Sequence, residues 1–232
     1  MIRWLQPGHP FPPVTEALAE PNGLLAAGGE LSPACLIDAY RHGIFPWFSA
    51  DQPVLWWSPD PRMVLMPDEL KIARSLAKVL RHRAYEARAD TAFERVITAC
   101  AAPRATQDGT WLGADMIDAY CTLHERGMAH SIEIWIDDEL AGGLYGVALG
   151  RMFYGESMFT RVPDASKIAL VHLARQLARW RFRMIDCQMH TPHLASMGAR
   201  EIPRTGFMRI LREQVNYSPV PGPWKLDLDL ID

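Results

Sequence analysis

An acid and an amide lie two positions apart in "MIDCQM", residues 184–189, among apolar neighbours. This composition favours a buried strand, in which Asp186 and Gln188 face one side while Ile185 and Cys187 face the other. Neighbouring backbone could satisfy both polar groups. Alternatively the pair does chemistry, because a carboxylate can accept a proton and an amide beside it can orient a nucleophile.

A second acid, Glu156, lies between Gly155 and Ser157 in the otherwise apolar segment "MFYGESMF", residues 152–159. A buried carboxylate requires a hydrogen-bonding or cationic partner. The sequence leaves two interpretations open. Glu156 is either an edge or structural carboxylate, or it recognises a cationic group of a substrate.

A run of basic residues without an acid occupies "KIARSLAKVLRHR", residues 71–83. Lys71, Arg74, Lys78 and Arg81 recur at spacings of three and four, so on a helix they share one face. One interpretation is the solvated outer face of a packed helix. The other is a contact with a phosphate backbone, which is independent of base sequence and sensitive to salt.

The composition of the chain limits the kinds of protein that it could be. The chain has 232 residues, of which 49% are hydrophobic and 22% charged, as in a globular protein with a core. Its net charge of −3 gives no global indication of nucleic-acid binding, so such binding needs a local basic patch. No apolar run approaches the roughly 20 residues that span a bilayer, and the first residues lack the apolar core of a signal peptide. Four scattered cysteines without a CxxC pair indicate reduced thiols. We therefore expect a cytoplasmic protein without membrane contact.

Periodicity, caps and breakers predict the elements that must position these residues. The first part of the chain is rich in Pro, Gly and Trp and contains one helix, which begins at Pro33 after the N-cap Ser32 and ends at Gly43. "SPDPR", residues 58–62, breaks the pattern, and we predict domains of residues 1–60 and 61–232. Beyond this break we predict strands at 63–66, 131–136, 140–149, 151–159 and 184–189, and helices at 68–83, 91–102, 113–127, 165–180 (capped by Asp164) and 191–198.

Three consecutive strands, a helix and a further strand are typical of an antiparallel meander followed by a crossover to a parallel strand. The predicted fold class is α/β, a mixed sheet of the α+β kind. The order resembles that of the GCN5-related N-acyltransferase (GNAT) fold, in which the acyl donor lies between two splayed strands. Here these strands would be 151–159 and 184–189.

Two motifs bear on cofactors. The turn "TRVPDASK", residues 160–167, precedes the crossover helix and contains no glycine. Pro163 removes an N–H group and Asp164 adds negative charge, so we do not expect the pyrophosphate of CoA there. "HTPH", residues 190–193, has the spacing of a pair of metal ligands, but no set of Cys or carboxylate partners accompanies it. We expect no metal and no other cofactor.

Long motifs from about residue 11 to residue 210 carry a more specific resemblance. In order, they are "EPNGLLAAGGELSPACLIDAYRHGIFPWFS", "LWWSPDPR", "GTW", "AHSIEIW", "YGESMF", "DAS" and "IDCQ". By these motifs the chain resembles the leucyl/phenylalanyl-tRNA–protein transferases. The resemblance implies a small N-terminal domain joined to a GNAT-like domain, with an aminoacyl ester of tRNA as the acyl donor.

The resemblance also implies an activity and its residues. The family transfers Leu or Phe, and Met less readily, from aminoacyl-tRNA to the N-terminal Arg or Lys of acceptor proteins, which marks them for N-degron-dependent degradation. It implies that Asp186, Gln188 and Glu156 act at the reaction centre. It assigns an apolar aminoacyl pocket to Trp47, Trp111, Tyr120, Leu144, Phe153, Met158 and Ile185, and tRNA contacts to Arg74, Lys78 and Arg81. We expect a monomer whose partners are Leu-tRNA, Phe-tRNA and such acceptor proteins.

Some alternatives stay open. A CoA-dependent N-acyltransferase and a non-catalytic tRNA-binding module are the competing functions. Leu173 and Leu177 stand where some members carry larger aromatics, which leaves the preference between Leu and Phe open. In the aromatic stretch at residues 43–62, we expect Trp56 and Trp57 to pack the two domains together, and Trp47 to form one wall of the pocket.

Overall fold

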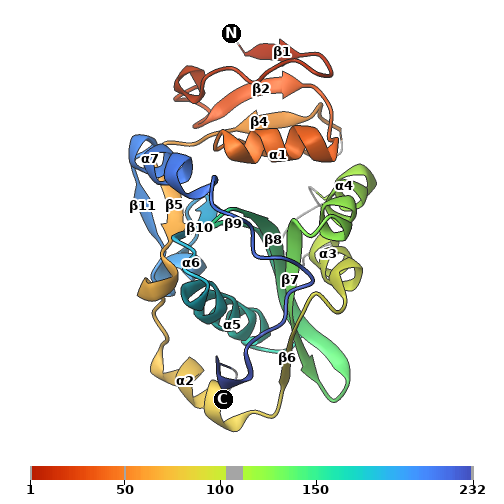
Figure 1. Cartoon of the computed structure of the whole chain (residues 1–232), viewed down its shortest axis with the longest axis vertical. Helices are drawn as coiled ribbons and strands as arrows, with labels where there is room; N and C mark the ends of the chain where they lie inside the picture. The colour runs from red at the N-terminus through yellow and green to blue at the C-terminus, as the bar shows by residue number, and fades with distance from the viewer. Residues whose placement is uncertain (1, 50, 103–111, 231–232) are drawn as a thin grey trace.

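The computed structural model of the chain describes residues 2–49, 51–102 and 112–230, which form a small sheet and a large sheet (Figure 1). The small sheet has the strand order β1–β2–β4–β3. Its region contains β1 (Arg3–Leu5), a 3-10 helix (Val14–Glu16), β2 (Leu24–Gly28), α1 (Pro33–Arg41), β3 (Phe45–Pro46) and β4 (Leu55–Trp57). As predicted, α1 follows Ser32, whose hydroxyl accepts a hydrogen bond from the Cys35 N–H.

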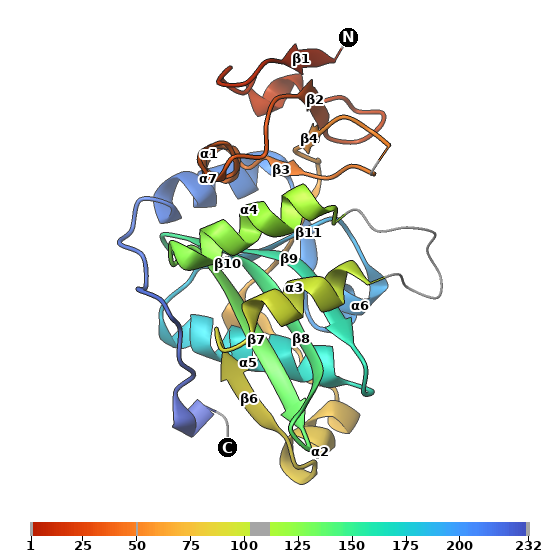
Figure 2. The same ribbon diagram turned by 90° about the vertical axis from the view of Figure 1, so that its right-hand side faces the viewer.

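The large sheet has the order β11–β5–β10–β9–β8–β7–β6. Its strands are β5 (Arg62–Leu65), β6 (Glu86–Ala89), β7 (Ala129–Ile136), β8 (Glu139–Leu149), β9 (Met152–Thr160), β10 (Met184–Gln188) and β11 (Arg200–Ile202). The helices of this region are α2 (Arg74–His82), α3 (Phe93–Ala101), α4 (Ala114–Glu125), α5 (Ala165–Arg179), α6 (Pro192–Ser196) and α7 (Arg204–Gln214), with 3-10 helices at Pro67–Glu69 and Leu228–Leu230. Helix α5 covers one face of the sheet, and α3 and α4 cover the other (Figure 2).

The predicted order of the core is confirmed. Strands β7, β8 and β9 form an antiparallel meander, α5 crosses the sheet, and β10 returns parallel to β9. The sheet is therefore mixed, as the fold class required. Among the described residues, no helix combines the length with the apolar character that crossing a membrane would need.

Strands β9 and β10 separate part-way along their length. Their pairing runs from Met184 opposite Met152 to Asp186 opposite Tyr154, whereas β9 stays paired with β8 as far as Thr160. The second half of β9 thus diverges from β10. This is the splay that the sequence order predicted, and it opens the sheet where the candidate residues lie.

The structure differs from the prediction at several elements. Helix α2 begins at Arg74 rather than at residue 68, because residues 67–69 form a 3-10 turn and the Lys71 N–H donates to the Met197 carbonyl at 2.9 Å. Asp164 precedes α5 with a φ of 69° and makes no capping hydrogen bond. Strands β6 and β11 and helix α7 were not predicted, because short edge strands and the irregular tail carry little periodicity.

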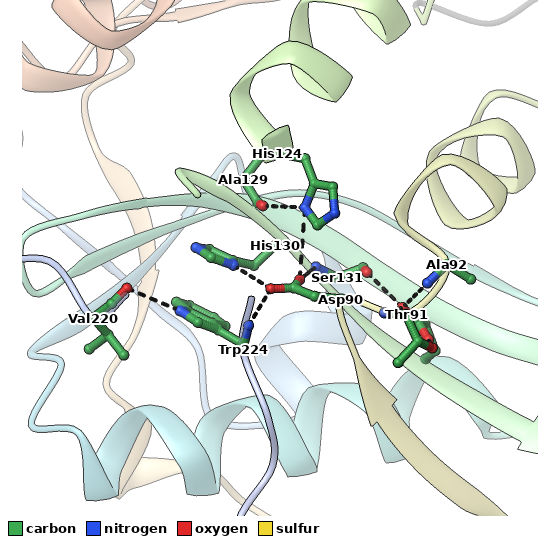
Figure 3. A network of polar contacts seen from close by, with 10 residues as sticks. Asp90, Thr91, Ala92, His124, Ala129, His130, Ser131, Val220 and Trp224 are labelled. Atoms are coloured by element: carbon green, nitrogen blue, oxygen red, sulfur yellow. Dashed lines mark hydrogen bonds and ion pairs between the residues drawn. The ribbon is translucent and has the colours of Figure 1, made fainter. Parts of the chain in front are cut away.

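A buried polar network fixes the end of the chain on the large sheet (Figure 3). The Asp90 carboxylate accepts hydrogen bonds from the Trp224 N–H at 2.6 Å and the Ser131 N–H at 2.9 Å, and it lies 2.8 Å from His130 Nδ1. The Trp224 indole stacks on the His130 ring with centroids 3.7 Å apart. These contacts join the segment after α7 to β7, the first strand of the meander.

Candidate active site

A cavity of about 1150 Å³ lies where β9 and β10 separate. Strands β9 and β10 and helices α5 and α6 form much of its wall, and the small sheet contributes Phe45, Pro46 and the following Trp47. Its apolar floor consists of Leu144, Phe153, Met158, Leu170, Leu173 and Ile185. Polar side chains in the wall include Glu156, Gln188, Lys167 and His193. An apolar surface with a few polar groups suits a ligand that has an apolar side chain and a polar end.

Glu156 reaches this cavity through a β-bulge. Tyr145 pairs with Ser157 and Gly146 pairs with Gly155, so Glu156 is an extra residue on β9 without a partner on β8. A bulge turns a side chain out of the regular alternation of a strand and is common beside active sites. Gly146 is required opposite the bulge, since a Cβ there would lie 2.1 Å from the Tyr154 carbonyl oxygen.

Two tyrosines from different parts of the chain hold the Glu156 carboxyl. The Tyr40 hydroxyl of α1 lies 2.7 Å from Oε1, the Tyr120 hydroxyl of α4 lies 2.7 Å from Oε2, and the two hydroxyls are 2.5 Å apart. Two hydroxyl protons satisfy two of these three contacts, and a protonated carboxyl supplies the third. Burial raises the pKa of Glu156 to about 7, although both tyrosine hydrogen bonds lower it. The carboxyl can therefore change charge near neutral pH.

Asp186 is fully buried, and both of its oxygens bind Arg62, the first residue of β5. Arg62 Nε donates to Oδ1 at 2.8 Å and Nη2 donates to Oδ2 at 2.6 Å, in a bidentate pair with neither side chain exposed. Arg62 Nη1 donates to the Gly43 carbonyl at 3.2 Å. The guanidinium also lies between the rings of Phe45 and Phe207, 4.7 and 4.6 Å from their centroids. The pair thus connects the region of the small sheet with β10.

A second β-bulge ends the regular alternation of β10. The pairing of β10 with β5 skips Cys187, and Gln188 has a φ of 58°. Consequently Gln188 lines the cavity together with Ile185 and Cys187, while Asp186 lies behind it on Arg62. The prediction that Asp186 and Gln188 share one side of a strand is therefore wrong. They are connected instead by a hydrogen bond from the Gln188 N–H to Asp186 Oδ1, at 3.0 Å.

Comparison with protein families identifies the family of the chain. The family model of the leucyl/phenylalanyl-tRNA protein transferases matches residues 64–212, and the model of the N-terminal domain of the same transferases matches residues 29–60. The chain belongs to this family. It is therefore an aminoacyltransferase, as the resemblance in the motifs implied.

Relatives of the transferase match over essentially the whole chain. The leucyl/phenylalanyl-tRNA–protein transferase of Thiobacillus denitrificans is 64% identical over 217 residues, which cover 94% of this chain and 95% of the relative. The transferase of Nitrosospira multiformis is 61% identical over 232 residues, which cover 100% of both chains. The solved structure of L-PGS from Bacillus licheniformis shares 12% identity with a TM-score of 0.39, over 74% of this chain and 57% of that chain, and carries no weight here.

Most of the residues that the resemblance assigns to the aminoacyl pocket of the transferase lie together. Trp47, Leu144, Phe153, Met158 and Ile185 line the cavity. Tyr120 is fully buried and donates to Glu156 from behind the cavity wall. Trp111 lies outside the described residues.

The basic stripe predicted for tRNA contact lies on α2. Arg74, Lys78 and Arg81 are exposed, and none of them forms an ion pair with a residue that the structure describes. Lys71 precedes the helix, so it does not extend the stripe as predicted. Arg83 is used differently, since its Nη1 donates to the Pro163 carbonyl at 2.6 Å.

Two residues of the site were missed from the sequence, namely Tyr40 and Arg62. Both lie within motifs that carried the resemblance, yet neither has a spacing that marks chemistry. A buried carboxylate needs a hydrogen-bonding or cationic partner, so Asp186 in a buried strand was the one available indication of a partner such as arginine. Nothing in the sequence pairs Tyr40 with Glu156, which is 116 positions away.

The aromatic stretch at residues 43–62 makes several contacts within the small-sheet region. The Trp56 indole is fully buried, packs on Phe11 with centroids 4.8 Å apart, and donates to the Gly28 carbonyl. The Trp57 indole donates to the Trp47 carbonyl. These interactions lie within the small-sheet region, while both indoles also belong to a hydrophobic core cluster that includes Val64 and Tyr154 of the large sheet. Tyr40 and Arg62 make polar contacts between the two sheet regions, and the Tyr154 hydroxyl of β9 donates to the Tyr40 carbonyl.

Proposed function

We propose that this enzyme transfers Leu or Phe, and Met less readily, from aminoacyl-tRNA to the α-amine of an N-terminal Arg or Lys of acceptor proteins. The observation that carries this proposal is that one cavity is lined both by the apolar floor and by Glu156. The floor suits the side chain of the donor amino acid, and the carboxyl suits a cationic acceptor. The relatives' names specify leucyl- and phenylalanyl-tRNA.

Selection of the donor follows from the apolar floor. Leu, Phe and Met have no branch at Cβ, whereas Val and Ile do, so we expect the pocket to favour the former by shape. Apolar pockets discriminate a methylene by only about 1–3 kcal/mol, so imperfect selection is expected. Leu173 is one residue of the floor where a larger side chain would reduce the space, so it bears on the preference between Leu and Phe.

The reaction is the aminolysis of an ester. The neutral α-amine attacks the ester carbonyl, a C–N bond forms, the C–O bond to the ribose breaks, and in net terms one amine proton passes to the released ribose oxygen. An α-amine has a pKa of about 8 in peptides, so a usable neutral fraction exists at pH 7. Ionised Glu156 attracts the cationic acceptor, and the Gln188 side chain orients the amine against the ester.

Asp186 acts in this scheme as a positioning residue. Its two oxygens already accept hydrogen bonds from Arg62, and Oδ1 also accepts the Gln188 N–H. It therefore fixes the unusual backbone of Gln188, whose φ is 58°, and so aims the amide into the cavity. A general base would instead need an oxygen within reach of the substrate amine.

The basic stripe of α2 is proposed to bind the tRNA backbone. Arg74, Lys78 and Arg81 offer exposed cations that no described acid neutralises, in a protein whose overall charge is negative. Such contacts position the nucleic acid without reading its bases. They would let one protein accept both Leu-tRNA and Phe-tRNA.

We propose further that the chain divides into domains at residue 60, that it acts as a monomer in the cytoplasm, and that the added residue marks acceptors for N-degron-dependent degradation. The division is supported by the two family models, which match residues 29–60 and 64–212. The cellular role follows from the family resemblance alone.

A transfer assay separates this function from its competitors. Labelled Leu-tRNA and a peptide that begins with Arg should give a labelled peptide, whereas acetyl-CoA should not acetylate the same peptide. A CoA-dependent enzyme is disfavoured by the absence of glycine from residues 160–167. A module that only binds tRNA would release no label to the peptide.

A further inference from the structure

The last part of the chain, residues 215–230, continues from α7 past β7 to α5 (Figure 1). It contains neither helix nor strand before its final 3-10 turn, and we call it the C-terminal strap. The Trp224 N–H donates to the Asp90 carboxylate. Nearer the end, Asp227 exchanges two hydrogen bonds with the Gln176 side chain of α5, at 2.8 and 3.0 Å. The C-terminal strap is therefore fixed to the large sheet, although the chemistry proposed above does not use it.

Trp224 is the most deeply buried point of this attachment, since its side chain is only 2% exposed. Its indole stacks on the His130 ring, and the Phe153 ring of β9 lies beside it, with centroids 5.9 Å apart and planes inclined at 35°. Trp180 and Phe182 enclose the indole further, at centroid distances of 4.9 and 6.1 Å. Ring pairs at such separations attract one another beyond the gain from burial alone. Trp224 thus connects the C-terminal strap to Phe153, which belongs to the apolar floor of the cavity.

The Phe153 ring is closely confined. It occupies the space above Gly146 of β8, where a Cβ would lie 2.6 Å from two carbon atoms of the ring. Gly146 pairs with His130 of β7, on which Trp224 stacks, so the ring and the indole are neighbours on one face of the sheet. Phe153 has no exposed surface. Because such an interior has almost no free volume, a donor side chain too long for the cavity must displace Phe153, and Trp224 resists that displacement.

We propose that Trp224 is a positioning residue that sets how large a donor side chain the enzyme transfers. It touches no substrate itself. It holds the Phe153 ring in place, and Phe153 limits the depth of the apolar floor, so donors of the size of Leu and Phe fit while bulkier ones are excluded. The inference rests on the proposed function, because it assumes that the donor side chain occupies this floor.

Transfer from a series of donors tests this role. The donors are tRNA charged with Leu, Phe or the larger naphthylalanine, and the enzymes are wild type, Trp224→Phe and Trp224→Ala. We expect Trp224→Ala to raise the ratio of kcat/KM for the naphthylalanine donor to that for the Leu donor about tenfold, the factor that one methylene of space is worth in an apolar pocket. Trp224→Phe, which keeps an aromatic ring, should retain most of the wild-type ratio. An unchanged ratio in Trp224→Ala would overturn the proposal.

Trp56→Ala is the matched control, because it removes another buried indole, in the small sheet. A loss of stability lowers the amount of folded enzyme and so affects all donors alike. Trp56→Ala should therefore leave the ratio between donors unchanged, and an equal shift in this variant would overturn the role of Trp224. If Trp224→Ala does not fold, Trp224→Leu provides a smaller reduction in size that keeps the site apolar, and the same shift in the ratio is expected.

A double-mutant cycle tests whether Trp224 acts through Phe153. Phe153→Leu shortens the floor residue itself and should shift the ratio in the same direction. Adding Trp224→Ala to Phe153→Leu should then change the ratio little further, whereas shifts that multiply would overturn the positioning role. If wild type transfers no Leu from intact Leu-tRNA, the proposed function itself is wrong. Normal transfer with a ratio that does not respond to Trp224 refutes this inference alone.

Discussion

Arg62 and Asp186 form a bidentate ion pair in which neither side chain has any exposed surface. The pair joins the first strand of the large sheet to β10, and Arg62 also reaches the Gly43 carbonyl beside the small sheet. Asp186 in turn accepts the N–H of Gln188, a residue of the cavity wall. One buried pair therefore couples the joint between the sheets to the candidate reaction centre.

Removing Asp186 should destabilise the protein strongly. Asp186→Ala leaves Arg62 buried and uncompensated, and loss of one partner of a buried pair typically lowers the free energy of unfolding by about 3–5 kcal/mol. Replacing both residues with apolar ones, Arg62→Met with Asp186→Leu, should recover most of that loss. Urea unfolding measures both effects. The exposed pair of Glu86 and Arg88 is the control, and Glu86→Gln should change stability little. An Asp186→Ala protein as stable as wild type would contradict the structure.

Asp186→Asn tests the positioning role directly. We expect a lower kcat because Gln188 is held less firmly, with no change in the pH at which kcat reaches half of its maximum. The pH profile of transfer at saturating donor and acceptor is the measurement. Loss of an ionisation from that profile would instead establish Asp186 as a general base.

Transfer should depend on the charge of Glu156. Its pKa of about 7 predicts that activity rises with pH around 7 as the carboxylate forms. Glu156→Gln should remove this rise from the pH–activity profile. The rise due to deprotonation of the acceptor amine, at about pH 8, should remain. Tyr120→Phe removes a hydrogen bond that lowers the pKa of Glu156, so the rise in activity that depends on Glu156 should move to higher pH. Tyr85→Phe, at a tyrosine that contacts His172 instead, is the control. Identical profiles for wild type and Glu156→Gln would refute this role.

The same raised pKa has a consequence for stability with a definite sign. The folded-state pKa of Glu156 lies above the value of 4.5 for an unperturbed glutamate. Its contribution is therefore fully present below pH 4.5 and is lost as pH rises through about 7. The stability of wild type relative to Glu156→Gln should decline over that range, which unfolding at a series of pH values measures. A constant difference would show that the carboxyl is not perturbed.

Substitution of Trp47 should mainly affect function, and substitution of Trp56 should mainly affect stability. Trp47 is 41% exposed and lines the cavity, while Trp56 is fully buried. Trp47→Ala should raise the KM for the donor and lower stability only slightly, because it loses one edge-to-face contact with the Trp57 ring while the hydrogen bond from the Trp57 indole to the backbone carbonyl of residue 47 remains. Trp56→Ala should lower stability by about 3–5 kcal/mol. Thermal unfolding and donor kinetics on both variants test this, and the reverse pattern would remove Trp47 from the pocket.

The basic stripe should make the affinity for tRNA depend on salt concentration. Replacing Arg74, Lys78 and Arg81 together by Gln should weaken tRNA binding and reduce the slope of log affinity against log salt by about 2–3. A control triple at Arg126, Arg209 and Arg212, which are also exposed, should leave the slope nearly unchanged. An unchanged slope in the α2 variant would assign the stripe to solubility.

The order of the elements was predictable because long strands and helices carry strong periodicity. The meander of β7, β8 and β9, the crossover by α5 and the parallel return of β10 all followed from it. The placement of Gln188 and Glu156 was not predictable, because each depends on a bulge that shifts the register by one residue. Gly155 beside Glu156 was the single local indication, since glycine inside a strand often marks a bulge.

Contacts between distant segments also escaped prediction. Tyr40 meets Glu156, and Arg62 meets Asp186, across 116 and 124 positions of sequence. Such pairs form only when the whole fold is assembled, so no local pattern encodes them. Much of the apolar pocket was available only through the family resemblance, because alternating apolar residues look alike whether they face a core or a cavity.

The most direct test of the central claim is the transfer of labelled Leu from Leu-tRNA to a peptide that begins with Arg. We expect label on this peptide, none when its α-amine is acetylated, and little when its first residue is Asp. The acetylated peptide shows that the α-amine is the nucleophile, and the Asp peptide shows that a cationic first residue is required. Absence of label on the Arg peptide, while Leu-tRNA remains intact throughout, would contradict the claim.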